Sequence, residues 1–373
     1  VLYAFTKFLV RTGLLIFFRK IVFENKRLLD QRGPLLLACN HPNSFLDALI
    51  IGSYFRQPVH FLARGDAFKK PFAKKILTAL KVIPIYRLNE GKEYLALNDV
   101  TFERCSQILV NGGIVLIFSE GLCINQWRLR PLKKGTARIA LNTWKYQKPP
   151  ESFRILPVSL NYSSFSRFRK NVVIHLGQEI KFSEVLKGTS EGEQIIDLNK
   201  LIYARLSSGL LLTEEDAATV PFLLSNLSLL AKQKEGVINV LKEKQAMLRQ
   251  GKEKNFDKLT GSKKIAVSRL SLLMCLFLTV TLCIPAVVGL LLHLPLYLPL
   301  NNFILKKTSG TVFYHSALFG ALIIFYPLYV LLISIALVIV EGRFVFLSVI
   351  LIMPFLAKIF LLWKDCLEVA RRT

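Results

Sequence analysis

A histidine and an aspartate lie close together in the segment Asn40–Asp47, with five residues between His41 and Asp47. Pro42 disfavours helical backbone at His41, so we expect His41 in extended or turn backbone just before a helix that begins near Phe45. An imidazole backed by a carboxylate can take a proton from a substrate hydroxyl, because the carboxylate fixes the tautomer and stabilises the imidazolium. The segment therefore predicts general-base chemistry on an alcohol.

A purely structural interpretation of the same segment stays open. Ser44 can cap the helix, and Asp47 occupies the reciprocal position of a capping box three residues later. Such a cap stabilises a helix by about 1 kcal/mol. In that case His41 is a solvent-facing turn residue, and the rest of the chain must decide between the two interpretations.

The elements around this segment follow a regular alternation from Pro34 to about Ile180. Apolar runs typical of strands cover residues 35–38, 59–63, 82–86, 114–118, 155–160 and 172–176. Helical patterns cover residues 46–55, 72–80, 93–111 and 135–144. The alternation predicts an α/β domain with a mixed, mostly parallel sheet flanked by helices. Ligands collect at the carboxyl ends of strands in such sheets, and His41, Arg87 and Glu120 each follow a predicted strand.

The composition indicates a membrane protein with an anionic partner. The 373 residues carry a formal net charge of +25, and 52% of them are hydrophobic. Apolar segments beside basic ones favour a lipid surface as the partner, and the chain shows no zinc-finger spacing, RNA-binding aromatic signature or basic-region heptads, so we expect no nucleic acid partner. The six cysteines form no CxxC pair, which indicates a reducing, cytoplasmic setting.

Four segments divide the chain. We expect an interfacial helix in residues 1–30, where Lys7 and Arg11 lie on one helical face; an amphipathic helix that covers the core is the alternative. Residues 31–185 form the α/β domain. Residues 186–265 are a polar helical connector, and residues 266–373 are an all-α membrane region. The chain begins at Val1, so we expect further residues upstream.

The membrane region contains three apolar runs. A span needs about 20 apolar residues, so residues 316–340 and 344–363 are expected to form a spanning hairpin. Residues 270–300 fit either one tilted helix with an interfacial piece or a re-entrant hairpin kinked at Pro285. If both units are hairpins, the positive residues fall on the cytoplasmic side with the α/β domain. These residues are Lys263, Lys264, Arg269, Lys306, Lys307, Lys364, Arg371 and Arg372.

Four short motifs occur in a fixed order: Asn40–Asp47, Pro84–Arg87, Phe118–Gly121 and Leu156–Val158, with a basic run after the third. The ordered set resembles the glycerol-phosphate acyltransferase family, which includes bacterial lysophosphatidate acyltransferases, over about residues 30–180. The five-residue spacing between histidine and aspartate is similar to the branch that contains fungal glycerol-3-phosphate/dihydroxyacetone-phosphate acyltransferases. The third motif departs from the family pattern at Ser119 and at Leu122-Cys123.

The resemblance implies a role for each motif. His41 would be the general base, and Asp47 would orient it. Arg87 would bind the acceptor phosphate, and Glu120 and Gly121 would shape the acceptor site. The basic run would bind the phosphates of coenzyme A or an acidic carrier protein, or else form a solvated, membrane-facing patch. This run comprises Lys133, Lys134 and Arg138.

The expected activity is therefore that of a membrane-bound O-acyltransferase in phospholipid biosynthesis. A fatty acyl chain would pass from acyl-CoA or acyl-carrier protein to 1-acylglycerol-3-phosphate or glycerol-3-phosphate, and the first acceptor would yield phosphatidic acid. We expect no metal and no cofactor, and a catalytic domain on the cytoplasmic face of a bacterial inner membrane or its equivalent. The alternatives are acylation of another lipid hydroxyl, such as an amino-acid lipid, and a non-catalytic protein that binds anionic lipids.

Overall fold

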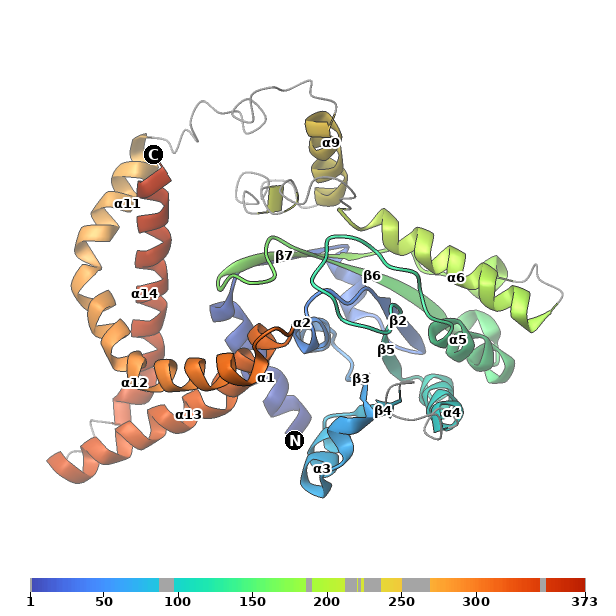
Figure 1. The fold of residues 1–373 in the computed structure, drawn as a ribbon, viewed down its shortest axis with the longest axis horizontal. Helices are drawn as coiled ribbons and strands as arrows, with labels where there is room; N and C mark the ends of the chain where they lie inside the picture. The colour runs from blue at the N-terminus through green and yellow to red at the C-terminus, as the bar shows by residue number, and fades with distance from the viewer. Residues whose placement is uncertain are drawn as a thin grey trace. The chain divides into compact units, whose positions relative to one another are not determined.

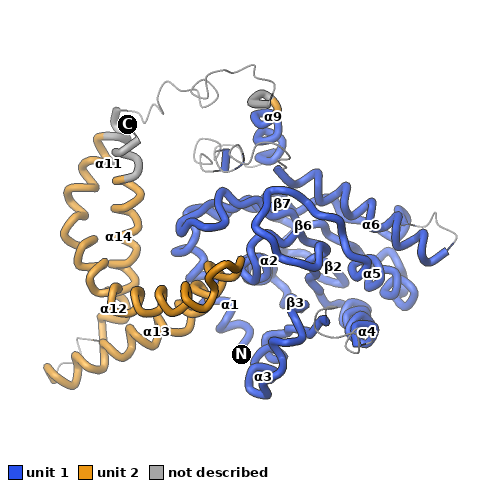
Figure 2. Tube along the Cα trace, in the orientation of Figure 1, with its two compact units in different colours: residues 1–245 blue, residues 246–373 orange. Residues whose placement is uncertain are grey.

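The structure is a computed structural model that describes residues 2–86, 97–185, 190–211, 220, 223–224, 236–249, 269–342 and 347–372. The chain divides into two compact units, Val1–Gln245 and Ala246–Thr373. Figure 2 colours them blue and orange. Arg87 and the first part of the helix expected over residues 93–111 lie outside the described residues, as does much of the expected connector.

One seven-stranded sheet forms the centre of the first unit, in the order β1-β7-β6-β2-β5-β3-β4 (Figure 1). Neighbouring strands are parallel except β6 and β7, which are antiparallel. The predicted mixed, mostly parallel sheet is confirmed. The strands are β1 (Phe18–Glu24), β2 (Leu35–Cys39), β3 (Val59–Arg64), β4 (Val82–Ile85), β5 (Ile114–Phe118), β6 (Arg154–Tyr162) and β7 (Lys170–Leu176).

The central strands are apolar throughout because helices cover both faces of the sheet. Strand β2 is buried along its whole length and pairs with β5 on one side and β6 on the other. Cys39, its last residue, is level with Phe118 of β5 and Val158 of β6. The chain after β2 and the chain after β5 therefore leave the sheet at the same edge.

Helices lie on the two faces of the sheet. Leu36 and Ala38 belong to a core cluster with side chains of α4 (Leu97–Val110), α5 (Gly135–Tyr146) and α6 (Glu191–Ser208). On the opposite face, Gly52 of α2 (Phe45–Tyr54) lies against the ring of Phe61. Other helices of this unit are α1 (Leu2–Phe17), α3 (Pro71–Ala79) and the short 3-10 helices Lys26–Asp30, Gly65–Phe68, Pro150–Ser152 and Phe182–Glu184. Helix α9 (Val237–Arg249) begins in this unit.

The amino-terminal segment is not a single helix. Helix α1 ends at Phe17, and residues 18–24 form edge strand β1, which pairs in parallel with β7. Lys7 donates to the Phe55 carbonyl at the end of α2, and the Arg11 guanidinium lies 4.8 Å from the Tyr54 ring centroid. The basic face of α1 thus packs against α2, and the interfacial position of this helix stays a prediction.

Residues beyond 185 continue the first unit. Helix α6 buries Leu198, Ile202 and Leu206 in the core cluster, and the Ser159 hydroxyl donates to the Leu206 carbonyl at 2.8 Å. The expected domain end at residue 185 therefore falls inside the compact unit, because the apolar face of α6 completes the core over β6.

The second unit consists of α11 (Arg269–Thr281), α12 (Cys283–Thr308), α13 (Tyr314–Glu341) and α14 (Val349–Arg372). Helix α14 runs along both α11 and α12 (Figure 1). The Trp363 indole donates to the Thr279 carbonyl at 2.9 Å, and Gly289 lies against the Leu356 backbone. The first apolar run breaks at Leu282, where α11 ends and α12 begins, and Pro285 lies in the first turn of α12, where proline is tolerated.

Two described helices, α12 and α13, are long and apolar enough to cross a membrane. They run antiparallel: the Tyr329 hydroxyl donates to the Leu292 carbonyl at 2.9 Å, and the Tyr314 hydroxyl donates to Asn301 Oδ1 at 2.5 Å. The structure differs from the expectation of a membrane span over residues 344–363. Helix α14 begins only at Val349 and carries Lys358 and Lys364, so it lies outside this pair.

Candidate active site

The His41 imidazole and the Asp47 carboxylate face each other at the edge where β2 and β5 end. His41 Nδ1 lies 2.9 Å from Asp47 Oδ2. Asp47 is fully buried on the first turn of α2, and the His41 side chain is 13% exposed. Because a carboxylate only accepts hydrogen bonds, Nδ1 carries the proton of the neutral ring and Nε2 keeps its lone pair. This is the arrangement that a general base needs.

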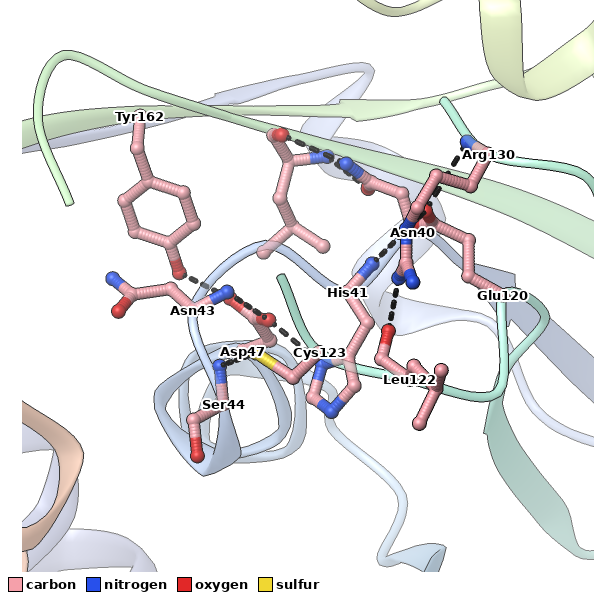
Figure 3. Close-up of polar contacts among 11 residues, drawn as sticks. Asn40, His41, Asn43, Ser44, Asp47, Glu120, Leu122, Cys123, Arg130 and Tyr162 are labelled. Atoms are coloured by element: carbon pink, nitrogen blue, oxygen red, sulfur yellow. Dashed lines mark hydrogen bonds and ion pairs between the residues drawn. The ribbon is translucent and has the colours of Figure 1, made fainter. Parts of the chain in front are cut away.

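The Asp47 carboxylate holds three donors at once. Its Oδ2 atom also accepts the backbone N–H of Asn43 at 2.8 Å, and its Oδ1 atom accepts the Tyr162 hydroxyl at 2.7 Å. Figure 3 shows these contacts converging on the carboxylate. A buried carboxylate held on both oxygens cannot rotate freely, so it presents one fixed orientation to the imidazole.

The capping role expected for Ser44 is wrong. Ser44 precedes α2 with φ 55° and makes no side-chain cap bond. Its backbone N–H donates instead to Cys123 Sγ at 2.9 Å. Burial and the nearby Asp47 charge raise the pKa of the Cys123 thiol to about 12, so the sulfur stays protonated and serves as a hydrogen-bond acceptor.

Glu120 holds the backbone of the histidine turn. Its Oε1 atom accepts the His41 backbone N–H at 2.8 Å. Its Oε2 atom accepts both Nε and the backbone N–H of Arg130, at 2.8 and 3.2 Å, and Arg130 also donates to the Leu122 carbonyl (Figure 3). Both Glu120 oxygens therefore accept hydrogen bonds from within the protein. The carboxylate holds the backbone position of His41.

The imidazole plane is fixed by a ring contact. The His41 ring stacks on Phe118, the last residue of β5, with 3.7 Å between centroids and 10° between planes. The Ile124 backbone N–H also lies 3.4 Å from the His41 carbonyl. Stacking, the Asp47 bond and the Glu120 bond together fix the orientation of the ring, with Nδ1 on Asp47 and Nε2 on the other side of the ring.

The remaining predicted binding residues lie around the turn after β5. Gly121 has φ +71°, and a Cβ there would come within 2.9 Å of Lys133 Cγ. The Lys133 backbone N–H donates to the Ser119 carbonyl at 2.8 Å. Lys134 and Arg138 are exposed at the start of α5. In the described part of the chain, no hydrogen bond or ion pair joins these three cations to His41 or Asp47.

Tyr162 and Lys170 are site residues that the sequence interpretation missed. Tyr162 ends β6 and reaches Asp47 directly, and Lys170 begins β7 and lies against the Tyr162 ring. Both strands begin more than a hundred positions after Asp47. One feature could have indicated Tyr162: if β6 pairs in parallel with β2, residues at the end of β6 lie near the end of β2. Arg130 was also missed, because it lies in a loop without a periodic pattern.

Comparison with known proteins relates residues 20–161 to acyltransferases. A family model described as Acyltransferase matches residues 20–161. An uncharacterized acyltransferase of Schizosaccharomyces pombe is 28% identical over 127 residues, which cover 32% of this chain and 19% of that protein. The chloroplastic 1-acyl-sn-glycerol-3-phosphate acyltransferase of Brassica napus is 29% identical over 110 residues, which cover 30% of each. The matches thus span less than a third of either relative.

Among solved structures, the 1-acyl-sn-glycerophosphate (LPA) acyltransferase of Thermotoga maritima is similar with a TM-score of 0.39 and 17% identity, covering 55% of this chain and 78% of that one. The matched residues 20–161 contain His41, Asp47, Glu120, Gly121 and Arg130. The His41–Asp47 pair thus lies within the segment that matches the Acyltransferase family model.

Proposed function

We propose that this chain is a membrane-bound acyltransferase of the lysophosphatidate acyltransferase type. It moves a fatty acyl chain from acyl-CoA or acyl-carrier protein to the hydroxyl of 1-acylglycerol-3-phosphate or glycerol-3-phosphate. The observation that carries the proposal is the 2.9 Å contact between His41 Nδ1 and the buried Asp47 carboxylate. A Brassica napus relative whose name states the first acceptor supports the substrate class.

The proposed reaction needs one proton transfer at the imidazole. His41 Nε2 takes the proton of the acceptor hydroxyl as its oxygen attacks the thioester carbonyl, and Asp47 stabilises the imidazolium that forms. Collapse of the tetrahedral intermediate expels the thiolate of the donor, which takes the proton from His41 and leaves as the thiol. No acyl-enzyme is needed, because the acceptor oxygen itself becomes the ester oxygen.

Membrane attachment is proposed to come from α12 and α13. These helices contain 26 and 28 residues, enough for the roughly 30 Å hydrocarbon core of a bilayer. A net charge of +25 suits an anionic membrane in which lipid substrates lie. We further propose that the acyltransferase domain faces the cytoplasm.

A second acceptor class is kept because of two residues. Leu122 is 44% exposed beside the site, and Cys123 Sγ accepts the Ser44 backbone N–H. Neither residue supplies a positive charge, although the resemblance implies a basic residue at this place. An acceptor without a phosphate, such as an amino-acid lipid with a free hydroxyl, would suit this apolar stretch.

The decisive experiment is a transfer assay with the purified full chain in vesicles, a radiolabelled acyl donor and a panel of acceptors. We expect labelled phosphatidate from 1-acylglycerol-3-phosphate, or labelled lysophosphatidate from glycerol-3-phosphate. His41→Gln should lower the rate by about 10²- to 10⁴-fold, the usual contribution of a general base. Transfer only to phosphate-free acceptors would favour the second class, and transfer to no acceptor at all would overturn the proposal.

A further inference from the structure

Tyr162 and Lys170 are two buried residues near the Asp47 carboxylate: the Tyr162 hydroxyl contacts it, and the Lys170 ammonium lies against the Tyr162 ring. Tyr162 is fully buried, and Lys170 is 2% exposed. The proposed reaction assigns neither of them a role. Both side chains carry polar groups that are costly to bury without partners, so their partners indicate what they do.

The Tyr162 hydroxyl is held in place by the packing of its ring. The ring centroid lies 6.2 Å from both the Phe18 and the Phe165 ring centroids. The Trp127 indole donates to the Tyr162 carbonyl at 2.7 Å, which anchors the end of β6. With ring and backbone both fixed, the hydroxyl points at Asp47 Oδ1 at 2.7 Å (Figure 3). Tyr162 thereby determines where the carboxylate lies.

The Lys170 ammonium lies between two aromatic rings. Its Nζ is 5.5 Å from the Tyr162 ring centroid and 6.0 Å from that of Phe18, distances at which a cation is attracted to a ring face. Nζ also donates to the Phe165 carbonyl at 3.0 Å. The Asp47 charge also acts on this ammonium, and opposite buried charges offset part of the cost of burying each.

Two opposing effects act on this lysine. Burial lowers the pKa of Lys170 to about 7, and the Asp47 charge acts in the opposite direction. Burial and the Asp47 charge also raise the pKa of the Tyr162 phenol well above its usual value, so the hydroxyl stays a donor. The titratable and charged groups around Asp47 are Cys39, His41, Cys123, Tyr162 and Lys170, and Glu120 and Arg130 act in turn on Cys123.

We propose that Tyr162 and Lys170 are positioning residues of this active site: Tyr162 fixes the orientation of the Asp47 carboxylate, and Lys170 balances its charge. The inference rests on the proposed function, because both residues act through Asp47 on the proton transfer at His41. A positive charge near Asp47 weakens the attraction between Asp47 and the imidazolium. Removing the Lys170 charge should therefore strengthen the hold of Asp47 on the protonated ring.

The test compares the pH dependence of kcat/KM in two variants of the full chain in vesicles. Tyr162→Phe keeps the ring and removes the donor, and we expect kcat to fall about 3- to 10-fold, the effect of one hydrogen bond. Lys170→Gln keeps a donor for the Phe165 carbonyl and removes the charge. We expect its acid limb to move about one unit to higher pH, because His41 then holds its proton more tightly.

Matched controls remove the same groups elsewhere in the first unit. Tyr3→Phe deletes a phenol that accepts the Val59 backbone N–H at 3.0 Å. Lys242→Gln deletes a half-buried ammonium that donates to the Ser207 carbonyl at 3.3 Å. Tyr3→Phe should keep the wild-type kcat, and Lys242→Gln should keep the wild-type acid limb. An unshifted acid limb in Lys170→Gln with an unchanged kcat in Tyr162→Phe would overturn the proposal.

A second readout separates this inference from the proposed function. In the full chain with ¹⁵N-labelled histidine, the imidazole resonance that is missing in His41→Gln can be followed through a pH titration. We expect its midpoint to move to higher pH in Lys170→Gln and to stay in place in Lys242→Gln. If Lys170 acts on His41 through Asp47, the midpoint moves even in a chain that transfers no acyl group. An unmoved midpoint contradicts this role of Lys170, even if the enzyme is active.

Discussion

At the scale of single residues, the histidine segment combines two functions in one carboxylate. Asp47 accepts the Asn43 backbone N–H, which ends the turn before α2, and the same oxygen accepts His41 Nδ1. The two interpretations of the sequence, a helix-start carboxylate and a partner of the base, are therefore compatible. Activity and stability measurements can separate the two roles, because in the proposed mechanism only the bond to His41 acts on the proton transfer.

Asp47→Asn tests that separation. The amide keeps the shape and an oxygen acceptor, but its neutral charge no longer stabilises the imidazolium, so we expect kcat to fall about 10²- to 10⁴-fold. The thermal unfolding midpoint in detergent should change by only a few degrees. Ser44→Ala is the control, since its side chain makes no cap bond, and it should change neither quantity appreciably. A mild rate loss in Asp47→Asn would return Asp47 to a structural role.

Glu120 offers a second prediction at this scale. Because its oxygens hold the His41 backbone and Arg130, we expect Glu120→Gln to lower kcat while leaving the KM for the acceptor within about 3-fold, as expected for loss of an interaction that acts in the transition state. Steady-state kinetics with varied acceptor measures both constants. A rise in KM without a fall in kcat would indicate direct contact with the acceptor.

At the scale of elements, the positions of most strands and helices in the sheet domain follow from local sequence. The long-range contacts between side chains of different elements do not. The runs at residues 35–38 and 114–118 are apolar throughout, and both form central strands. Strand β1 escaped prediction because Arg19 and Lys20 interrupt its apolar pattern, and an edge strand needs only one covered face. The contact between His41 and Asp47 was predictable because the two residues are six positions apart. Tyr162 is 115 positions from Asp47, so no local sequence pattern indicates their contact.

The contact of α9 with β1 carries a pH-dependent prediction. Burial raises the pKa of Glu24, but the His175 hydrogen bond and charge and the backbone N–H groups of Ile238 and Gly236 outweigh it, so the net shift is downward. A carboxyl whose pKa is lower in the folded than in the unfolded state stabilises the fold above its unfolded pKa of about 4.3. That stabilisation disappears as the pH falls through the folded value.

We therefore expect Glu24→Gln to lower the unfolding midpoint at pH 7, with the difference from wild type shrinking as the pH falls below about 4. Thermal unfolding of the detergent-solubilised chain at several pH values measures this difference. The exposed Glu151 provides the control, because Glu151→Gln should leave the midpoint unchanged at every pH. A Glu24→Gln difference that stays constant down to pH 3 would contradict the linkage.

At the scale of the whole molecule, each unit has its own construction. The first unit contains the complete sheet and every described residue of the candidate site. In the second unit, α11 has 13 residues, which span about 20 Å at 1.5 Å per residue and fall short of a bilayer core. Helices α12 and α13 exceed that thickness, and their antiparallel pairing places the turn between them, residues 309–313, at one end of the pair.

This geometry predicts the sidedness of three positions in membranes. If α12 and α13 both cross, Cys283 at the start of α12 and Glu341 at the end of α13 lie on one face, and Ser309 lies on the other. Single-cysteine chains that retain Cys283 or carry Ser309→Cys or Glu341→Cys can be labelled with a membrane-impermeant thiol reagent in oriented vesicles. We expect Cys283 and Glu341→Cys to react from the same side. A Cys283 that reacts together with Ser309→Cys would instead support the re-entrant hairpin, because that topology returns the chain to its starting face before Lys306.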